Sequence, residues 1–370
     1  MKLCSFKGLR NVLYSPYGRF QGLMKNEISV YRWTIGVLLL FLIYVTYDQI
    51  PYVAEVVNSI DAPRAIKIYS TKFFGQPFDK GVFWDCPDVT EHCQIVNTLS
   101  SDVAAVVVHS RDSCEIEGKN RLNVPYIFLA LENPSNAFRQ GHFDPGYNLT
   151  MTYRHDSDII ASYGSFTEAE NTEINLDDFW NGKTKEALWI ASNCYTENRR
   201  KETIQQMQKL GLKVEIRGKC GKRTMSREKL PDWYGNDTKF YMAFENMNCK
   251  DYITEKFYKS LLTRQQVPIV FSRIIEKSGI PGDSFISLDD FDSLSDAVKF
   301  IKSVGESKEK YLNYHQWRLR LKVTSRINLG FCKLCQLLKN GTVPMKSYGN
   351  IKKWYDPDKD CSMTREGRQG

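Results

Sequence analysis

This sequence lacks the residues for two common kinds of site, a cysteine-based metal or redox site and a basic surface that binds nucleic acid. Its only Cys-x-x-Cys motif, Cys332 to Cys335, has no second such motif and no spaced pair of histidines to accompany it, so a zinc site or a redox pair has no support. A strongly basic surface is also missing. About +5 of the net charge of +8 comes from residues 1–32, and the remainder is only mildly basic. We therefore predict no nucleic-acid partner.

Charge is also absent from the run between Trp33 and Tyr47. At about 1.5 Å per residue this run would be roughly 22 Å long as a helix, which is short for a membrane span. A cleaved signal sequence and a buried helix are the alternatives. The long basic leader has no convincing small-residue cleavage site, however, so we predict an uncleaved signal anchor over residues 33–50.

The charges that flank this span predict its orientation. Basic residues precede it and acidic residues follow it. The positive-inside rule then places a basic tail, residues 1–32, in the cytosol and the rest of the chain in the lumen, as in a type II membrane protein. A short span suits the thinner membranes early in the secretory pathway. Residues 51–65 include Pro51 and Pro63 and predict a short stem.

Cysteines and glycosylation sequons are compatible with this topology. Nine of the ten cysteines follow the predicted span, where an oxidising lumen permits disulfides. Three Asn-x-Ser/Thr sequons lie on the same side, at Asn148, Asn236 and Asn340. Such triplets arise often by chance, so they agree with a lumenal domain without proving one.

Continuous apolar runs predict an α/β protein in two halves. Runs of this kind suit strands that are covered on both faces of a parallel sheet. In the first half they occupy residues 65–69, 103–109 and 124–131. A polar and acidic segment, 167–185, predicts the crossing between the halves. The second half opens with a strand at 187–191, a helix at about 198–210 and a strand at 212–216.

One stretch of the second half joins a buried strand to a charged helix start. Residues 239–244 are apolar and aromatic enough for a covered strand, and Glu245 and Asn246 come where that strand ends. Asp251 is a candidate cap for the helix that follows. Ligands of open α/β sheets lie at the carboxyl ends of strands, near helix N-termini. The stretch therefore predicts either a ligand site or an ordinary strand-helix-strand unit with solvated charges.

The same stretch resembles a family signature. Phe-Glu-Asn at 244–246, followed by Asp-Tyr-Ile-Thr-Glu-Lys at 251–256, is similar to the donor-binding signature of the α-1,3-fucosyltransferases of glycosyltransferase family 10. These are inverting enzymes that use GDP-fucose. Glu-Asn-Pro-Ser at 132–135 and the block at 147–158 also resemble this family. The resemblance runs from about Ile66 to Cys335. It implies a GT-B fold, in which two Rossmann-like domains face a cleft.

The resemblance implies a general base at Glu132, which follows a predicted buried strand. An acceptor hydroxyl that attacks a sugar must lose its proton as the new bond forms, and a carboxylate within hydrogen-bond reach can accept that proton. The alternative is a solvated loop carboxylate, which is what most glutamates are.

The donor site is implied on the other half of the chain. Alignment of Ser192 and Asn193 with the family favours Arg200 over Arg199 for a pyrophosphate contact, because the planar guanidinium binds two phosphate oxygens at once. Lys256 would neutralise the departing diphosphate. The remaining donor-binding candidates are Asn193, Asn246 and Tyr252, with Glu255 on the ribose hydroxyls and Glu245 on fucose. Glu245 is equally compatible with a structural carboxylate of the turn.

The Asp-x-Asp motif at Asp156 and Asp158 supports a different chemistry when it is read in isolation. Hard carboxylate oxygens suit Mn²⁺ or Mg²⁺, and such a motif can hold a nucleotide diphosphate in a metal-dependent nucleotide-sugar transferase. The resemblance instead assigns this segment to the acceptor side, so we predict no metal and no required cofactor, with a divalent cation at most stimulatory. A second alternative is a catalytically silent, membrane-tethered glycan-binding protein. Asn148, in the same block, is either glycosylated or structural.

The resemblance also implies structural disulfides near the C-terminus, with Cys332, Cys335 and Cys361 as candidates. Cys86 and Cys93 are candidates for a local pair, and the connectivity stays open. The chain departs from the family in the turn before the signature helix and at Thr263 to Gln266, where no glycine ends that helix. This second departure puts donor affinity, and even activity, in question.

These observations combine into one prediction. An acceptor-binding domain spans 66–185, a GDP-fucose-binding domain spans 186–345, and a tail over 346–370 is either mobile or covers part of the second domain. The partners are GDP-fucose, a glycan that contains N-acetylglucosamine, the membrane and, as a candidate, a second copy of the chain. The predicted location is the Golgi membrane. Whether the acceptor is the N-glycan core or an outer-chain lactosamine stays open, since loops vary freely on such scaffolds.

Overall fold

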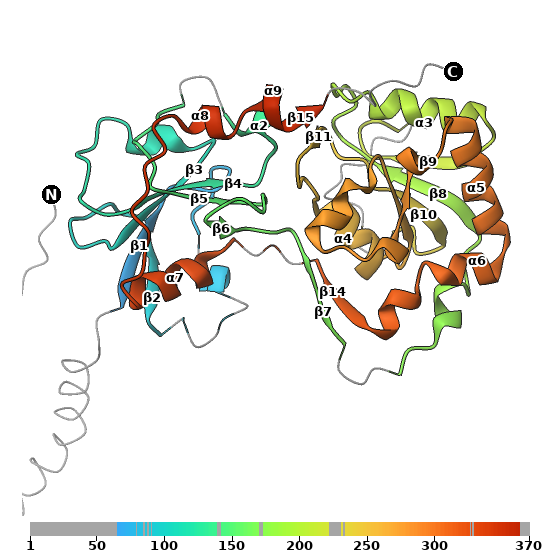
Figure 1. Ribbon diagram of the computed structural model, residues 1–370, viewed down its shortest axis with the longest axis horizontal. Coiled ribbons are helices and arrows are strands. Elements are labelled where there is room, and N and C mark those ends of the chain that lie inside the picture. Colours follow the sequence, from blue (N-terminus) through green and yellow to red (C-terminus); the bar gives the residue numbers. More distant parts are fainter. Residues whose placement is uncertain are drawn as a thin grey trace, which may run out of the picture. The chain divides into compact units, whose positions relative to one another are not determined.

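The computed structural model describes most of the chain from residue 65 to residue 362 (Figure 1). The gaps within this range are residues 79, 84–85, 87–88, 90, 139–141, 170–172, 222–230, 232–233, 326 and 328. The predicted cytosolic tail, the anchor at 33–50 and nearly all of the stem lie outside the described residues. Among the residues that are described, no helix is both long enough and apolar enough to span a membrane.

The first half forms a parallel sheet of six strands in the order β2-β1-β3-β4-β5-β6. The strands are β1 (Ile66–Ser70), β2 (Cys93–Val96), β3 (Ala105–His109), β4 (Tyr126–Ala130), β5 (Leu149–Thr152) and β6 (Ile159–Ile160). Every residue of β3, β4 and β5 is buried. Both faces of these strands are therefore covered, which explains why their sequences are apolar without alternation.

The second half forms a parallel sheet of five strands in the order β13-β12-β10-β8-β9. Its strands are β8 (Lys185–Ile190), β9 (Val214–Arg217), β10 (Thr238–Met242), β12 (Val267–Val270) and β13 (Ile286–Ser287). Its helices are α3 (Arg200–Lys209), α4 (Glu255–Leu262), α5 (Leu294–Glu306) and α6 (Lys308–Asn313). Ile204 of α3 and Ile301 of α5 are fully buried in the core around this sheet, as their helical spacing predicts.

Short elements join and cover these sheets. An antiparallel pair, β7 (Ser165–Glu168) with β14 (Leu321–Thr324), and a two-residue pair, β11 (Asn248–Cys249) with β15 (Cys361–Ser362), stand outside the main sheets. The remaining α-helices are α2 (Pro134–Ala137), α7 (Phe331–Lys339), α8 (Ile351–Trp354) and α9 (Pro357–Asp360). The 3-10 helices are η1 (Lys80–Phe83), η3 (Ser113–Ile116), η4 (Leu176–Phe179), η6 (Arg273–Ser278), η7 (Gly282–Ser284), η8 (Leu288–Asp290) and η9 (Gln316–Leu319).

After the second sheet the chain returns to the first, which the sequence did not predict. Helix α7 falls inside the range assigned to the second domain, but Phe331 packs on Phe78, with ring centroids 5.2 Å apart. Disulfides join this helix to the first half by linking Cys86 to Cys332 and Cys93 to Cys335. The local pairing of Cys86 with Cys93 is therefore wrong. The two helical cysteines are three residues apart, so both lie on one face of α7. Each can therefore reach its own partner in the first half.

The C-terminal segment, which we define as residues 346–361, also packs on the first half. Tyr348 forms a backbone bridge with Tyr147, and Ile351 and Tyr355 are fully buried in a core cluster around that sheet. We predicted a tail that is mobile or covers part of the second domain. The end of this segment does reach the second half, where β15 pairs with β11, but most of the segment packs on the first half. Its apolar side chains complete the first core. Figure 1 shows α8, α9 and β15 leading from the first sheet to β11.

Candidate active site

Glu132 follows β4 at the carboxyl end of the first sheet, where the sequence placed it. Its side chain is half-buried, and its backbone carbonyl accepts a hydrogen bond of 2.5 Å from the hydroxyl of Tyr355. Burial raises the pKa of the Glu132 carboxyl, while the positive charges of Lys256 and Arg111 oppose that shift. Lys256 belongs to the second half of the chain, so the predicted base lies within electrostatic range of the predicted donor site.

Glu245 and Lys256 form a buried ion pair at the N-terminus of α4. One carboxylate oxygen of Glu245 accepts hydrogen bonds from the backbone N–H and the hydroxyl of Thr254, both at 2.8 Å. The other accepts from Lys256 Nζ, also at 2.8 Å. Burial disfavours the charged ammonium, but the carboxylates of Glu245 and Glu255 outweigh it and raise the pKa of Lys256. The two carboxylates thus hold the lysine charged, although the N-terminus of a helix by itself disfavours a cation.

These contacts favour the structural interpretation of Glu245, because both of its oxygens are engaged within the turn. They also correct the predicted helix cap. Helix α4 begins at Glu255, and Thr254 caps it by accepting a hydrogen bond from the Lys256 N–H. Asp251 instead has a left-handed backbone, with φ of 58°, and its carboxylate accepts a hydrogen bond from the His155 N–H at 3.0 Å. The observed cap therefore lies three positions after the predicted one.

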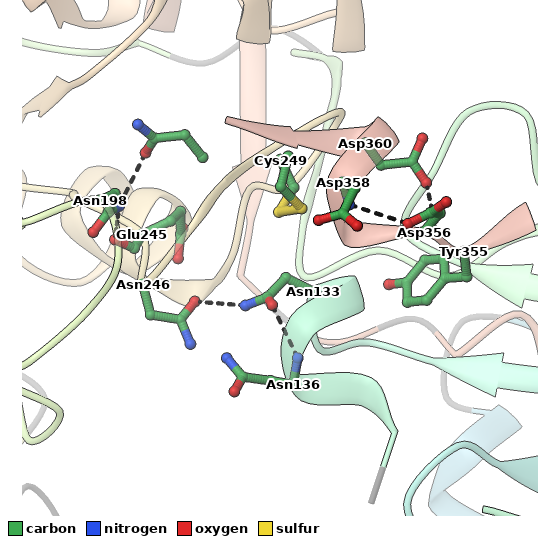
Figure 2. The surroundings of a disulfide bond; sticks show 12 residues. Asn133, Asn136, Asn198, Glu245, Asn246, Cys249, Tyr355, Asp356, Asp358 and Asp360 are labelled. Carbon is green, nitrogen blue, oxygen red and sulfur yellow. Dashed lines mark hydrogen bonds between the residues drawn. A yellow bond between two sulfur atoms is a disulfide. The ribbon is translucent and has the colours of Figure 1, made fainter. Parts of the chain in front are cut away.

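A pair of asparagines connects the two halves beside Glu132. The side-chain amide of Asn133 donates to Asn246 Oδ1 at 3.0 Å, and Figure 2 shows the two side chains meeting between α2 and the loop that follows β10. Asn133 is fully buried and also caps α2. Tyr252 is buried against Tyr153, with ring centroids 4.9 Å apart. Two of the donor-binding candidates, Asn246 and Tyr252, thus contact residues of the first half.

Arg200 lies at the start of α3, but its guanidinium binds protein carbonyls. It donates to Phe244 O at 2.8 Å and to Asn193 O at 2.9 Å. Asn198 supports the same loop, because its side-chain amide donates a hydrogen bond to Glu245 O at 2.9 Å (Figure 2). The sequence did not identify Asn198, since an asparagine in a loop carries no distinguishing signal. These residues support the loop after β10, and the predicted pyrophosphate contact of Arg200 stays a prediction.

A cavity of about 360 Å³ opens at the carboxyl ends of β10 and β12. Its walls come from the loop after β10, the start of α4, the residues after β12 and the end of the C-terminal segment, and they include Glu245, Tyr252, Phe271, Ser272 and Asp360. The edge of the sheet is where open α/β folds bind ligands. Because Glu245 lines it, the cavity lies beside the Glu245–Lys256 pair, and binding of the donor there stays a prediction.

The atypical exit of α4 folds without the expected glycine. Gln265 adopts the left-handed conformation, with φ of 52°, that a glycine would take at no steric cost. Its neighbours are anchored to the turn before β10. Arg264 donates to Tyr234 O and Gln266 donates to Gly235 O, each at 2.9 Å. The departure from the family pattern thus produces a strained but well-anchored turn.

The two aspartates of the Asp-x-Asp motif have separate protein partners. Asp156 forms ion pairs with Arg154 at 2.5 Å and with Lys250 at 3.1 Å. Asp158 accepts hydrogen bonds from the Thr150 N–H at 2.8 Å and from the Tyr348 hydroxyl at 2.7 Å. Within the described ranges, no three His, Cys, Asp or Glu side chains come together as metal ligands. The geometry therefore does not support the metal-dependent alternative.

The three sequons differ in their surroundings. Asn148 is engaged at both side-chain atoms, because its oxygen accepts from the Tyr126 N–H at 3.0 Å and its nitrogen donates to Lys346 O at 2.9 Å. This favours the structural role over a glycan at Asn148. Asn236 and Asn340 are exposed, and glycosylation there stays a prediction.

Two further disulfides lie near the site. Cys249, three residues after Asn246, is bonded to Cys361 at the end of the C-terminal segment. Cys194 is bonded to Cys220 and joins the loop after β8 to the segment after β9, a pairing that the sequence did not predict. Cys332, Cys335 and Cys361 are thus all disulfide-bonded, with partners far away in the chain.

Comparison with known proteins identifies the class of this fold and site. Residues 180–354 match the family described as glycosyltransferase family 10 (fucosyltransferase), C-terminal part, and residues 61–164 match the fucosyltransferase N-terminal family. Together these matches cover most of the chain. This protein belongs to glycosyltransferase family 10, the fucosyltransferases.

Individual relatives agree with this assignment. The chain is 38% identical over 317 residues to alpha-(1,3)-fucosyltransferase fut-5 of Caenorhabditis elegans, which covers 79% of this chain and 83% of the relative. It is 31% identical over 296 residues to mouse 4-galactosyl-N-acetylglucosaminide 3-alpha-L-fucosyltransferase 9, which covers 76% and 79%. A crystal structure of an alpha1,3-fucosyltransferase with GDP-fucose superposes with a TM-score of 0.51 at 15% identity, over 76% of this chain and 91% of that one. This last similarity supports the α/β fold with parallel sheets.

Proposed function

We propose that this protein transfers L-fucose from GDP-fucose to an N-acetylglucosamine hydroxyl of a glycoprotein glycan, with an α-1,3 linkage and inversion at the anomeric carbon. The observation that carries the proposal is the hydrogen bond of 3.0 Å between the side chains of Asn133 and Asn246. Asn133 directly follows Glu132, and Asn246 directly follows Glu245, the ion-pair partner of Lys256, so this contact brings the predicted base and the predicted donor site together from different sheets. The two sheets would then act as the two Rossmann-like domains of a GT-B enzyme, with the reaction between them.

The reaction is a single displacement. The acceptor oxygen forms a bond to the anomeric carbon of fucose from the face opposite GDP, and its proton passes to the Glu132 carboxylate. The bond from the anomeric carbon to the β-phosphate oxygen breaks, and its electron pair stays on GDP. One displacement from the opposite face inverts the configuration, so a β-linked donor yields an α-linked product.

Lys256 and the N-terminus of α4 stabilise the charge on the leaving GDP. The ammonium is kept charged by Glu245 and Glu255, and its contact with Thr254 Oγ1, at 2.7 Å, holds it at the first turn of the helix. Backbone N–H groups at this turn favour an anion for the same electrostatic reason. The base and the cation thus act on opposite sides of the reacting carbon.

We further propose a type II orientation in the Golgi membrane, with residues 66–361 in the lumen. The uncharged run at 33–47 and the basic residues before it support this orientation. The four disulfides in the described part of the chain are compatible with an oxidising compartment.

The test is a transfer assay with the purified full-length protein in detergent. GDP-fucose is incubated with a panel of defined glycans that includes N-glycan cores and lactosamines, and the products are analysed by mass spectrometry and NMR. We expect fucosylated product from at least one acceptor, and we expect Glu132→Gln to lower kcat about 10²- to 10⁴-fold, the usual contribution of a general base. Glu117→Gln, which changes an exposed glutamate of the same half, should keep full activity.

A well-folded wild-type protein that binds GDP but transfers fucose to no acceptor would instead support a silent glycan-binding protein. Full activity in Glu132→Gln would remove the proposed base.

A further inference from the structure

We propose that Tyr355, in the C-terminal segment, is a positioning residue that holds the general base in place. This inference rests on the proposed function, because it takes Glu132 as the base. The Tyr355 hydroxyl donates to the backbone carbonyl of Glu132 at 2.5 Å, across 223 residues of sequence. The tyrosine is fully buried, so water cannot replace this donor without rearrangement.

The position of Tyr355 is set by the segment around it. Its neighbour Trp354 is stacked against it, with ring centroids 5.9 Å apart and an interplanar angle of 16°. Arg154 lies over the Trp354 ring at 4.2 Å and donates to the Trp354 carbonyl at 2.8 Å. Arg154 also pairs with Asp360 at 2.5 Å. The hydroxyl is therefore aimed by a side chain that has little freedom to turn away.

On its other side, the base is held by the loop after β10, which carries Glu245 and Asn246. Asn133, which directly follows Glu132, donates to Asn246 across the two halves. Three residues beyond Asn246, the disulfide from Cys249 to Cys361 attaches that loop to the end of the C-terminal segment (Figure 2). The loop that bears the base and the loop that precedes α4 are thus fastened to the same segment. Through Tyr355 this segment sets where the base lies relative to the donor.

Removal of the hydroxyl should affect the chemical step more than donor binding. Without its donor the buried Glu132 carbonyl loses a partner, and the loop relaxes to find another. A shift of the Glu132 carboxylate by about 1 Å lowers kcat, because proton transfer needs the carboxylate within hydrogen-bond reach of the acceptor hydroxyl. The predicted donor contacts lie on the second half, so binding of GDP-fucose should change little.

The experiment compares Tyr355→Phe with Tyr348→Phe in the full-length protein. Tyr348 is the matched control, because it lies in the same segment and its hydroxyl also bonds to the first half, at Asp158 2.7 Å away, but it does not contact Glu132. We expect Tyr355→Phe to lower kcat about tenfold with the KM for GDP-fucose within about twofold of wild type. Tyr348→Phe should keep kcat within about twofold.

A second pair of variants makes the test independent of folding. Replacement of Tyr355 by 4-fluorophenylalanine fills the volume of the hydroxyl without a donor, whereas 4-aminophenylalanine restores an N–H donor at the same place. We expect the amino variant to regain most of the lost kcat and the fluoro variant to regain none. Equal kcat in these two variants, equal losses in Tyr355→Phe and Tyr348→Phe, or wild-type kcat in Tyr355→Phe would each overturn the inference. Absence of transfer by the wild-type protein would instead refute the proposed function.

Discussion

Replacement of Glu245 by Gln separates the two roles that the sequence allows for this residue. If Glu245 is a structural carboxylate, its loss removes the nearer of the two carboxylates that pair with Lys256, leaves Glu255 at 3.6 Å, and places an amide beside the ammonium. The two side chains are only 11% and 16% exposed, so solvent compensates poorly. Breaking one partner of a buried ion pair costs about 3–5 kcal/mol. Gln keeps one acceptor for Thr254, and we therefore expect a loss near the lower limit, about 3 kcal/mol.

Thermal unfolding measures this loss. At about 2–4 °C per kcal/mol for a chain of this size, Tm should fall by about 6–12 °C. The matched control is Glu276→Gln, which removes one of the two ion-pair partners of Arg273, in a pair whose side chains are 37% and 40% exposed. An exposed pair contributes about 0–1 kcal/mol, so the control should lower Tm by less than about 4 °C.

The outcome that refutes this reasoning is equally specific. If Glu245→Gln unfolds at the same temperature as the control variant, the ion pair does not stabilise the turn as its burial indicates. A large loss of kcat at unchanged Tm would assign Glu245 to the reacting sugar, the other role that the sequence allows.

Three further predictions concern the base, the exit of α4 and the C-terminal disulfide. Burial raises the pKa of Glu132, and a base acts only when it is deprotonated. The pH profile of kcat/KM should therefore fall on the acidic side at a pH above 4.5, the ordinary pKa of glutamate. A fall only at or below pH 4.5 contradicts this prediction. Gln265→Gly should stabilise the protein by about 0.5–1 kcal/mol in thermal unfolding, since glycine removes the strain of the left-handed backbone. The same change at the exposed Gln205 inside α3 should destabilise the protein by about 1 kcal/mol. Stability changes of the same sign at both sites would refute the strain at Gln265. The double variant Cys249→Ser and Cys361→Ser opens a loop of 112 residues and should lower the free energy of unfolding by about 4–5 kcal/mol, and an unchanged Tm would show that the disulfide does not constrain the chain.

Local sequence was informative wherever one segment carried its own signal. The apolar runs located β3, β4 and the strands around Glu245, because a strand buried on both faces has almost no polar positions. Glu132 and Lys256 could be named because each sits beside a short motif that resembles the family. The helix cap was misplaced by three residues, since Asp251 and Thr254 are both good capping residues and only the backbone geometry distinguishes them.

The sequence by itself determined the class of this protein, the two α/β halves and the residues that carry the proposed chemistry. Only the tertiary structure decided which distant segments meet. It paired Cys86 with Cys332 and Cys249 with Cys361, and it brought Tyr355 to the carbonyl of Glu132. The physical reason is that a strand or a helix start follows from neighbours in the chain. A disulfide or a buried hydrogen bond between residues more than a hundred positions apart depends on how whole layers pack, and that packing leaves no local pattern.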